Sequence, residues 1–324
     1  MFEIRRYAPE YSAAWNSFVA RSKNGTFLFD RRYMDYHADR FCDYSLMIYR
    51  KNRIFALLPA NEQGNVLHSH QGLTYGGLLL DGKATTGEVC ELFRLLNNYL
   101  RERGFNRIVY KAIPYIYHQQ PAQEDLYALT NVCQARIVAR HISSTIVMNK
   151  RQKFAESRRS GLRKALNNGI TARESGDLNT FWTILSNNLH RKYGSVPVHS
   201  AEEMELLKSR FPDNIKLFMA YQGDIALGGA LLYVTPQVVH TQYISASPEG
   251  KNAGALDLLF NYLLNDVYTD YHYFDFGKSS NGDGHELNAP LIFQKEGFGG
   301  RGVCYDWYEW DLLTDNPPQN DNQR

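Results

Sequence analysis

One acidic side chain stands in a strongly apolar stretch of the sequence. Asp275 lies between Phe274 and Phe276, and a strand points such neighbours to opposite faces. A buried carboxylate requires a partner, so we predict that Asp275 acts as a base or positioning group, or caps the turn after the strand. Lys278 and Ser279 follow that strand's end, where α/β sheets commonly bind ligands, and are predicted substrate contacts.

A second candidate is a lysine surrounded by glycines. Lys295 is followed by Gly297, Gly299 and Gly300, which let the chain fold tightly over a ligand. A solvated lysine before a turn is the alternative.

Three further patterns bear on ligands. His68 and His70 share a predicted strand face and His240 lies on another strand, but no third ligand has matching spacing, so no metal is predicted. The four cysteines are far apart without a C-x-x-C pair, which argues against a zinc site or disulfide framework. Residues 150–164 carry seven basic residues and one acid, and form either a phosphate-binding surface or a solvated helix.

The elements that must position these residues occur twice. Residues 46–49 and 54–58 predict a hairpin, residues 66–70 a third strand, residues 89–100 an amphipathic helix and residues 107–111 a strand. The same order returns in strands over 216–221, 225–234 and 238–245, a helix over 256–267 and a strand over 271–277. This repeat predicts two copies of one α/β (α+β type) domain, each a mixed, mostly antiparallel sheet flanked by helices.

We place the domain boundary near Asn149. The predicted N-terminal domain is residues 1–149, the C-terminal domain is residues 150–313, and residues 314–324 form a disordered tail without aliphatic side chains. A chain of 324 residues is long for one compact core, which agrees with two domains.

Composition excludes several classes of protein. A 44% hydrophobic and 22% charged content is typical of a globular chain, and a net charge of +2 does not favour bulk nucleic-acid binding. No run approaches the ~18 apolar residues of a membrane span, and the N-terminus lacks a signal peptide's apolar stretch. We therefore expect a cytoplasmic protein, with the oligomeric state left open.

Residues 243–255 contain the end of a predicted strand, a glycine-containing loop and the start of a predicted helix. This arrangement resembles the acyl-CoA loop of GNAT acyltransferases. In that family, backbone N–H groups and a helix N-terminus meet the donor's pyrophosphate, which requires small residues. The resemblance implies an acetyl-CoA or other acyl-CoA donor held by seven residues: Glu249, Gly250, Lys251, Asn252, Ala253, Gly254 and Ala255. It also implies that Tyr243 could reprotonate the thiolate, with core packing as the alternative.

A wider resemblance covers nearly the whole chain. Residues 158–170 are similar to the "R-x-x-[IL]-R-K-A-x-x-x-G" segment that opens the second domain of tandem-GNAT proteins related to the Fem-type peptidyltransferases of cell-wall synthesis. Residues 273–277 look like their late strand and turn, and residues 287–300 resemble their "L-x-x-F-K-x-G-F" segment. The resemblance implies that Lys295 presents a cation to the transfer centre. It also implies that the acceptor cleft lies between the two domains, with Tyr75 and Gly76 on the side of a degenerate N-terminal domain.

Three functions follow as hypotheses. The favoured one is an acyltransferase that moves an acyl group from acyl-CoA to an amine or hydroxyl of a small-molecule, saccharide or cell-envelope acceptor. The resemblance implies that it is an N-acetyltransferase. An aminoacyl-tRNA-dependent Fem-type peptidyltransferase is the alternative. Its support is the basic segment, and its difficulty is the missing long helical hairpin that many tRNA-using Fem factors carry. A non-catalytic tandem-GNAT binding protein is the second alternative.

Overall fold

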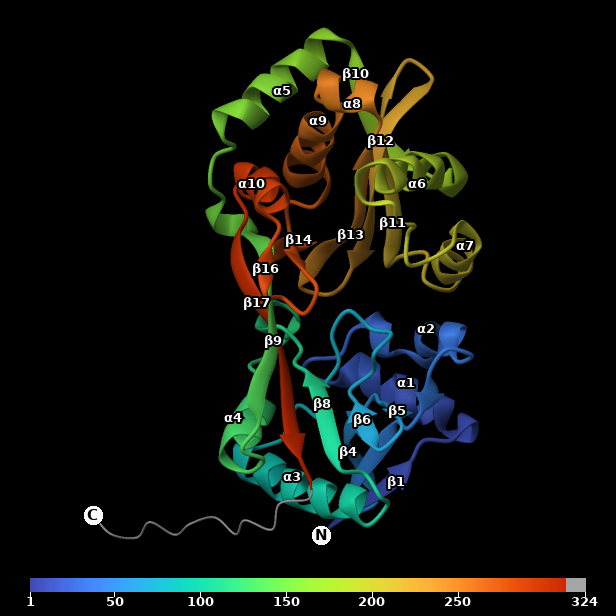
Figure 1. Ribbon diagram of the computed structural model, residues 1–324, viewed down its shortest axis with the longest axis vertical. Helices are drawn as coiled ribbons and strands as arrows, with labels where there is room; N and C mark the ends of the chain where they lie inside the picture. Colours follow the sequence, from blue (N-terminus) through green and yellow to red (C-terminus); the bar gives the residue numbers. More distant parts are fainter. Residues whose placement is uncertain (313–324) are drawn as a thin grey trace, which may run out of the picture. The chain divides into compact units, whose positions relative to one another are not determined.

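The computed structural model describes residues 1–312, so the predicted tail over residues 314–324 lies outside the described residues. The described chain divides into two compact units. The first contains residues 1–25, 37–139 and 306 onward, and the second contains residues 26–36 and 140–305. Each unit is an α/β layer structure (Figure 1).

The first unit has two sheets, with strand orders β1-β3-β4-β7 and β17-β8-β6-β5-β2. Its elements are β1 (Phe2–Arg6), α1 (Ser12–Arg21), β2 (Cys42–Asp43), β3 (Leu46–Arg50), β4 (Arg53–Leu58), β5 (Asn61–Gln63), β6 (Val66–His68), β7 (Leu79–Leu80), α3 (Thr86–Arg101), β8 (Arg107–Lys111), α4 (Glu124–Asn131) and the end of β17 (Arg301–Asp311).

Local sequence accounts for several of these elements. Lys51 and Asn52 have positive φ angles of 47° and 61°, which close the predicted hairpin between β3 and β4 with a tight turn. Thr85 and Glu88 form a capping box at the start of α3. Gly104, with a φ of +85°, follows the helix's last turn.

The second unit has the strand order β10-β11-β12-β13-β14-β9. Its elements are α2 (Arg31–Met34), most of β9 (Arg136–Val147), α5 (Glu156–Asn167), β10 (Ile170–Ser175), α6 (Leu178–Tyr193), α7 (Ala201–Arg210), β11 (Ile215–Gln222), β12 (Ile225–Val234), β13 (Val238–Ala246), α8 (Pro248–Ala253), α9 (Ala255–Tyr262), β14 (Tyr273–Lys278), β15 (Ser280–Asn281), β16 (Glu286–Leu287) and α10 (Ala289–Gly297). A π-helical turn, Leu263–Val267, continues α9.

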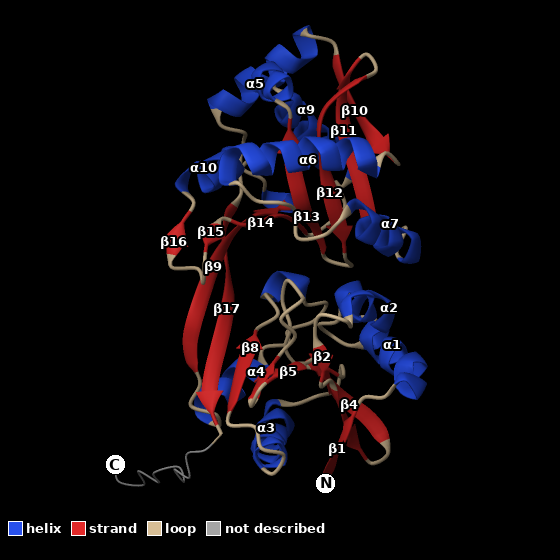
Figure 2. Ribbon diagram, turned by 45° about the vertical axis from the view of Figure 1, so that its right-hand side comes forward, coloured by secondary structure: helices blue, strands red, loops and turns tan. Residues whose placement is uncertain are grey.

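Helices cover both faces of this sheet. Helix α9 packs on β10, β11 and β12, while α6 packs on β12 and β13 from the opposite face (Figures 1 and 2). The predicted meander is confirmed as β11, β12 and β13 in consecutive antiparallel pairs. The helix and strand predicted to follow it are also confirmed, and their apolar faces form the unit's core around Leu259, Phe260 and Phe274.

The two units are not consecutive pieces of sequence. Residues 26–36 group with the second unit because Phe27 and Tyr33 pack in an aromatic cluster with Phe211 and Tyr233, whose hydroxyl lies 3.1 Å from that of Tyr33. Strands β9 and β17 each contain a boundary between units. The division at Asn149 differs from this grouping, and the extent of each folding domain stays a prediction.

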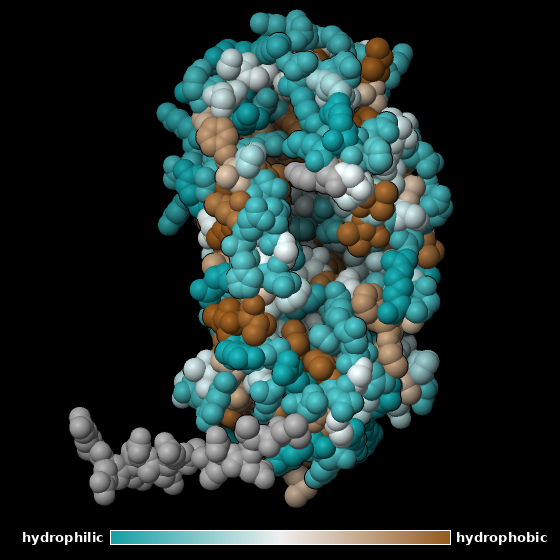
Figure 3. Space-filling view, in the orientation of Figure 1, coloured by the Kyte–Doolittle hydropathy of each residue, from teal (hydrophilic) through white to brown (hydrophobic). Residues whose placement is uncertain are grey.

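None of the described helices combines the length and the apolar character that a membrane-spanning helix requires. On the face shown in Figure 3, hydrophilic residues cover most of the surface and apolar residues form small separate groups.

Candidate active site

Two neighbouring strands of the second unit separate along their length. Strands β13 and β14 pair in parallel over only three residue pairs, which end at His240 and Asp275. Both strands then continue, β13 to Ala246 and β14 to Lys278, without further pairing between them. Ile244 from β13 and Phe276 from β14 line one cavity of about 530 Å³, so the divergence of the strands opens this cavity.

We call this space the donor-side cavity. Its apolar side is formed by Leu256, Phe260, Phe276 and Phe298. Four cations also line it, together with one acid: Arg158, Lys192, Lys251, Lys295 and Asp257. Arg158 is paired with Asp257 at 2.9 Å, which leaves an excess of positive charge in the lining. Such a cavity suits a ligand with an apolar body and an anionic group.

The loop after β13 is held by its own side chains. Ser247 caps α8, since its Oγ accepts a hydrogen bond from the Gly250 N–H at 3.0 Å. Gly254 has a φ of +81° and ends α8 while α9 begins at the next residue. Lys251 donates a hydrogen bond to Asn188 Oδ1, and burial together with the charges of Lys192 and Arg191 lowers the pKa of its ammonium.

Four of the seven predicted donor-binding residues line the cavity, namely Gly250, Lys251, Gly254 and Ala255. Glu249, Asn252 and Ala253 are not among its lining residues. Glu249 and Asn252 are exposed. The role of the loop in phosphate binding stays a prediction.

The loop glycines are required by packing. A Cβ on Gly250 would lie 2.1 Å from the carbonyl oxygen of Leu227, and one on Gly254 would lie 2.2 Å from that of Gly161. Both contacts are too short for any side chain. A substitution of Gly254 by a larger residue would therefore disturb the fold, so it cannot test ligand binding at this loop.

Lys295 is buried in α10 and lines the donor-side cavity. Its Nζ donates hydrogen bonds of 2.8 Å to the carbonyl oxygens of Gly277 and Lys278, at the end of β14. Burial lowers the pKa of this ammonium to about 8, although the charge of Asp275 acts in the opposite direction. The lysine thus fixes the position of α10 against the strand end and also carries a cation into the cavity.

Asp275 is completely buried and accepts four hydrogen bonds. The donors are Ser143 Oγ, Thr145 Oγ1 at 2.8 Å, His240 Nδ1 at 2.7 Å and Tyr305 OH at 2.8 Å. Burial alone would raise the pKa of the carboxyl, but the hydrogen bond and charge of His240 and the hydroxyl donors outweigh it and lower the pKa to about 2. Asp275 is the centre of a satisfied polar network and does not line the cavity.

The network lies next to the lysine. A Cβ on Gly277 would come within 3.2 Å of His240 Cε1, so the imidazole edge lies against the backbone whose carbonyl binds Lys295. Gly277 has a φ of +73°, and the pairing of β14 with β9 shifts register between Asp275 and Lys278. His240, Gly277 and Lys295 therefore form one connected group.

The other predicted residues lie elsewhere. The phenol of Tyr243 is 2.6 Å from His199 Nδ1 and is outside the lining of the donor-side cavity; burial raises its pKa. Ser279 is buried, with its N–H donating to Ile142 O at 2.8 Å, and neither it nor Lys278 lines the cavity. The Lys278 pKa is lowered by burial.

Tyr75 and Gly76 belong to the first unit. Tyr75 is buried with its ring 4.4 Å from that of Tyr117. A Cβ on Gly76 would lie 1.7 Å from Ser69 O. Packing within the unit explains both residues, and their acceptor role stays a prediction.

Sequence reasoning identified Asp275 and Lys295 but missed the partners of Asp275. His240 was considered only as a metal ligand, and Ser143, Thr145 and Tyr305 were not considered. The run of three hydroxyl residues, Ser143, Ser144 and Thr145, within the otherwise apolar end of β9 was an available signal for the two hydroxyls. Within residues 1–312, no group of three or more His, Cys, Asp or Glu side chains is placed to hold a metal ion.

Comparison with known proteins identifies the domain that carries this site. A family model described as "Acetyltransferase (GNAT) domain" matches residues 149–285, which include β13, the loop after it, α9 and β14. Residues 149–285 are therefore similar to a GNAT domain. A search of the curated proteins gave no match.

Solved structures extend the likeness in fold to nearly the whole chain. FemX has 12% sequence identity and a TM-score of 0.63, covering 94% of this chain and 96% of its own. L-PGS from Bacillus licheniformis has 13% identity and a TM-score of 0.60, covering 97% and 95%. A tandem GNAT protein from the clavulanic acid biosynthesis pathway has 10% identity and a TM-score of 0.51, covering 98% and 100%.

These likenesses confirm the predicted tandem-GNAT fold, which this chain shares with FemX. At such low identities the solved structures show the fold alone. The GNAT domain supports acyl transfer as the class of reaction and an acyl-CoA as the general class of donor.

Proposed function

We propose that the protein transfers an acyl group from acyl-CoA to an amine or hydroxyl of an acceptor, and that the donor occupies the donor-side cavity. The observation that carries this proposal is the divergence of β13 and β14 beside the loop that opens α9. The apolar side of the cavity fits the pantetheine arm and acyl chain. The ammonium groups of Lys251 and Lys192 fit the phosphates.

Different residues of the chain are proposed to bind different parts of the donor. The backbone N–H groups at the start of α9, an eight-residue helix, lie where the loop meets the cavity and suit an anionic group. The bound donor supplies the acyl group as an activated thioester. Phe260 and Phe276 exclude water from the apolar end of the cavity, which strengthens electrostatic contacts within it.

Lys295 is the residue proposed to act on the reacting group. Lys295 lines the cavity, and its ammonium has three N–H groups. Among the described residues, the carbonyl oxygens of Gly277 and Lys278 accept two hydrogen bonds from it. A third N–H directed at the acyl oxygen would stabilise the negative charge that develops during attack. The pairing of Asp275 with His240 is proposed as a positioning device, since it fixes the strand end to which Lys295 is bound.

The acceptor is proposed to be a saccharide or another cell-envelope precursor. Its support is the resemblance of residues 287–300 to the segment of Fem-type peptidyltransferases, a segment that forms α10 and the turn after it. An amino sugar is the simplest acceptor of this class that carries both an amine and hydroxyls.

An aminoacyl-tRNA donor is the rival proposal, and α5 supplies its support because it carries Arg158, Arg159 and Arg163. All three of these cations are already paired with carboxylates of their own unit, Arg158 with Asp257, and Arg159 and Arg163 with Glu156. The longest described helices, α3 and α6, have 16 residues each, too short for a long inserted hairpin. These observations favour acyl-CoA.

Calorimetric titration with acetyl-CoA tests the donor. We expect binding to the natural chain and a loss of about 10- to 100-fold in affinity for Lys251→Gln, the range for losing one charged hydrogen bond. Lys164→Gln is the matched control, because Lys164 is exposed and outside the cavity lining. Binding of aminoacyl-tRNA without binding of acetyl-CoA would support the rival donor, and binding of neither would support a non-catalytic protein.

A further inference from the structure

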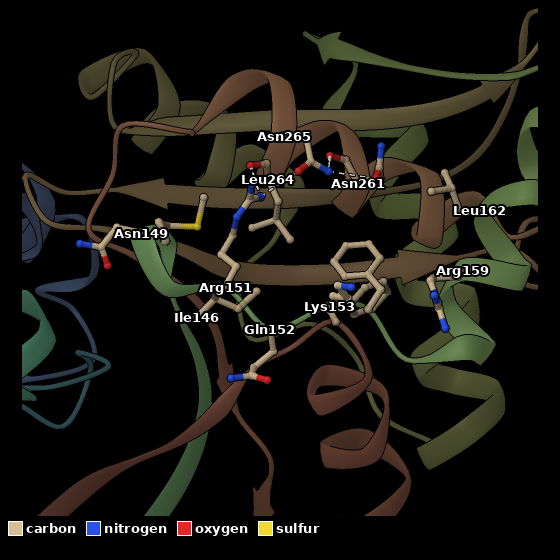
Figure 4. A pocket seen from close by; sticks show the side chains of 13 residues that line it. Ile146, Asn149, Arg151, Gln152, Lys153, Arg159, Leu162, Asn261, Leu264 and Asn265 are labelled. Atoms are coloured by element: carbon tan, nitrogen blue, oxygen red, sulfur yellow. Dashed lines mark hydrogen bonds between the residues drawn. The ribbon is translucent and has the colours of Figure 1, made fainter.

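A second cavity, of about 590 Å³, lies in the same unit and shares only Phe298 with the lining of the donor-side cavity. It lies between the segment that leads into α5, the C-terminal end of α9 with its π-helical turn, and the end of β9 (Figure 4). We call it the basic cavity. Its lining consists of Ile146, Met148, Asn149, Arg151, Gln152, Lys153, Phe154, Arg159, Leu162, Asn261, Leu264, Asn265 and Phe298.

The guanidinium of Arg151 is fixed at the wall of this cavity (Figure 4). Its NH1 donates hydrogen bonds to Leu264 O at 2.6 Å and to Asn265 Oδ1 at 2.9 Å. These two bonds use both hydrogens of one nitrogen. The other edge of the guanidinium is formed by Nε and NH2, and none of the described residues accepts a hydrogen bond from it. This edge has the geometry for bidentate recognition of a carboxylate or phosphate.

The π-helical turn explains how Arg151 is held. In Leu263–Val267 the N–H of Tyr268 bonds to Leu263 O, a spacing of five residues, and Leu264 O accepts from Arg151. Asn265 Nδ2 donates to both Asn261 O and Asn261 Oδ1 at 2.9 Å, which aligns the two amides along the wall. Single π-helical turns recur at functional sites, because they shift the side chains that follow.

Charge and apolar surface are separated within the basic cavity. Arg151, Lys153 and Arg159 line it, and no carboxylate does. Glu156 offsets Arg159, at 2.6 Å, but makes no ion pair with Arg151 or Lys153. The apolar part includes Leu264, Met148 and Phe298, all buried, and half-buried Phe154, whose ring is 5.3 Å from that of Phe298.

We propose that the basic cavity is a second ligand site that binds a small organic anion, a phosphate monoester or carboxylate attached to an apolar body. The anionic group binds the Nε–NH2 edge of Arg151 and the ammonium of Lys153, and the apolar body packs against Phe154 and Leu264. Asn261 Nδ2 offers a neutral donor beside them. A site of this volume is within the ordinary range for small-molecule ligands.

The test is calorimetric titration of the full chain with phenyl phosphate, benzoate, inorganic phosphate and benzyl alcohol. We expect phenyl phosphate or benzoate to bind at least about tenfold more tightly than inorganic phosphate and benzyl alcohol, since only the first two carry both chemistries. The relative affinity of phenyl phosphate and benzoate distinguishes a phosphate from a carboxylate ligand. Equal binding of benzyl alcohol, or binding of none of the four probes, overturns the proposal.

Variants locate the site. Arg151→Gln is expected to weaken the better probe by about 10- to 100-fold and Lys153→Gln by about tenfold, because each removes a charged donor. No carboxylate among residues 1–312 forms an ion pair with Lys153, so its variant keeps the test valid if loss of Arg151 unfolds the π-helical turn. Lys164→Gln, on the same basic segment, and Lys251→Gln, in the donor-side cavity, are the controls. Loss of affinity in either control equal to that in Lys153→Gln would overturn the assignment.

Discussion

The ammonium of Lys295 donates hydrogen bonds to the end of β14, and Lys295 also lines the donor-side cavity. We predict that Lys295→Met lowers kcat by about 100- to 1000-fold, the range for removing one donor to a developing oxyanion. Stability also falls, because the carbonyls of Gly277 and Lys278 lose a charged donor worth about 1.5–3 kcal/mol. Turnover of acetyl-CoA with an amino sugar, normalised to the folded fraction from thermal denaturation, separates the two effects.

The pH dependence decides whether the charge of Lys295 matters. The pKa of about 8 means that the ammonium loses its proton as pH rises through 8, so a cationic role predicts a fall in kcat there. Lys295→Arg stays charged over that range and should remove the fall. An increase in kcat above pH 8 would instead identify the neutral amine as a base, and an unchanged profile in both proteins would make Lys295 purely structural.

At the residue scale, sequence patterns revealed the chemical groups but not their partners. Asp275 was recognisable because an acid between two phenylalanines in a strand must be compensated. Its donors come from β9, β13 and β17, and the distance along the chain from Ser143 to Tyr305 hides their proximity. No local periodicity encodes which distant strand becomes the neighbour of β14.

At the scale of elements, the crossing of α5 and α9 controls the position of the loop at the donor-side cavity. A Cβ on Gly161 would lie 2.0 Å from Asp257 Oδ2, and Gly161 O is the atom that Gly254 approaches. We predict that Gly161→Ala destabilises the protein by about 1–3 kcal/mol, because Asp257 must move away from Arg158. Chemical denaturation of both proteins measures the change.

Gly87→Ala is the matched control for this prediction. Gly87 is also a helical glycine, in the first turn of α3, but a Cβ there meets nothing within 4 Å. This variant should be neutral or stabilise by about 0.4–1 kcal/mol through the unfolded state. Equal effects of the two substitutions would show that the α5–α9 crossing tolerates a wider separation than its geometry indicates.

Elements with strong periodicity were predictable, and those defined by distant partners were not. The local sequence predicts the apolar face of helix α3 and the antiparallel meander from β11 to β13. The π-helical turn after α9 could not be predicted in this way, because its hydrophobic spacing continues that of the helix. The carbonyl of Leu264, within this turn, accepts a hydrogen bond from Arg151, which lies 113 residues away in the sequence. The basic segment was predicted to be helical from Lys150, but α5 begins only at Glu156, and residues 151–154 before it line the basic cavity as irregular backbone.

At the scale of the whole molecule, composition and the internal repeat were sufficient to predict two α/β units, but not which residues each contains. Amphipathic strands and helices can be recognised from the hydrophobic pattern of about ten or fifteen residues. The aromatic contacts of Phe27 and Tyr33 that group residues 26–36 with the second unit join positions about two hundred residues apart. Long-range packing of this kind requires the three-dimensional structure.

The two units contain buried aspartates with opposite electrostatics. In the first unit, Asp125 accepts hydrogen bonds from Tyr110 OH at 2.5 Å and from Leu126 N–H at 2.8 Å, but its complete burial raises the carboxyl pKa from 3.8 to about 6. In the second unit, the pKa of Asp275 is lowered to about 2. The stability of the units should therefore respond differently to acid.

The sign of each effect follows from proton binding. Between pH 4 and 6 the folded first unit binds more protons at Asp125 than its unfolded chain does, so its stability rises as the pH is lowered through this window, by roughly 2–3 kcal/mol at most. Asp275 contributes stability that is present above pH 4 and is lost only as the pH falls toward 2. Acidification from pH 6.5 to 4.5 should consequently stabilise the first unit through Asp125 without loss from Asp275.

Hydrogen exchange, corrected for intrinsic rates, measures this difference within one sample. Backbone amides of β8 should gain protection between pH 6.5 and 4.5 relative to those of β12. Asp125→Asn cannot titrate and should abolish the gain, whereas Asp39→Asn, at an exposed position of the same unit, should retain it. If β8 gains as much protection in Asp125→Asn as in the natural chain, the pH response of the first unit arises from other groups, and the buried carboxylate is already compensated by Tyr110.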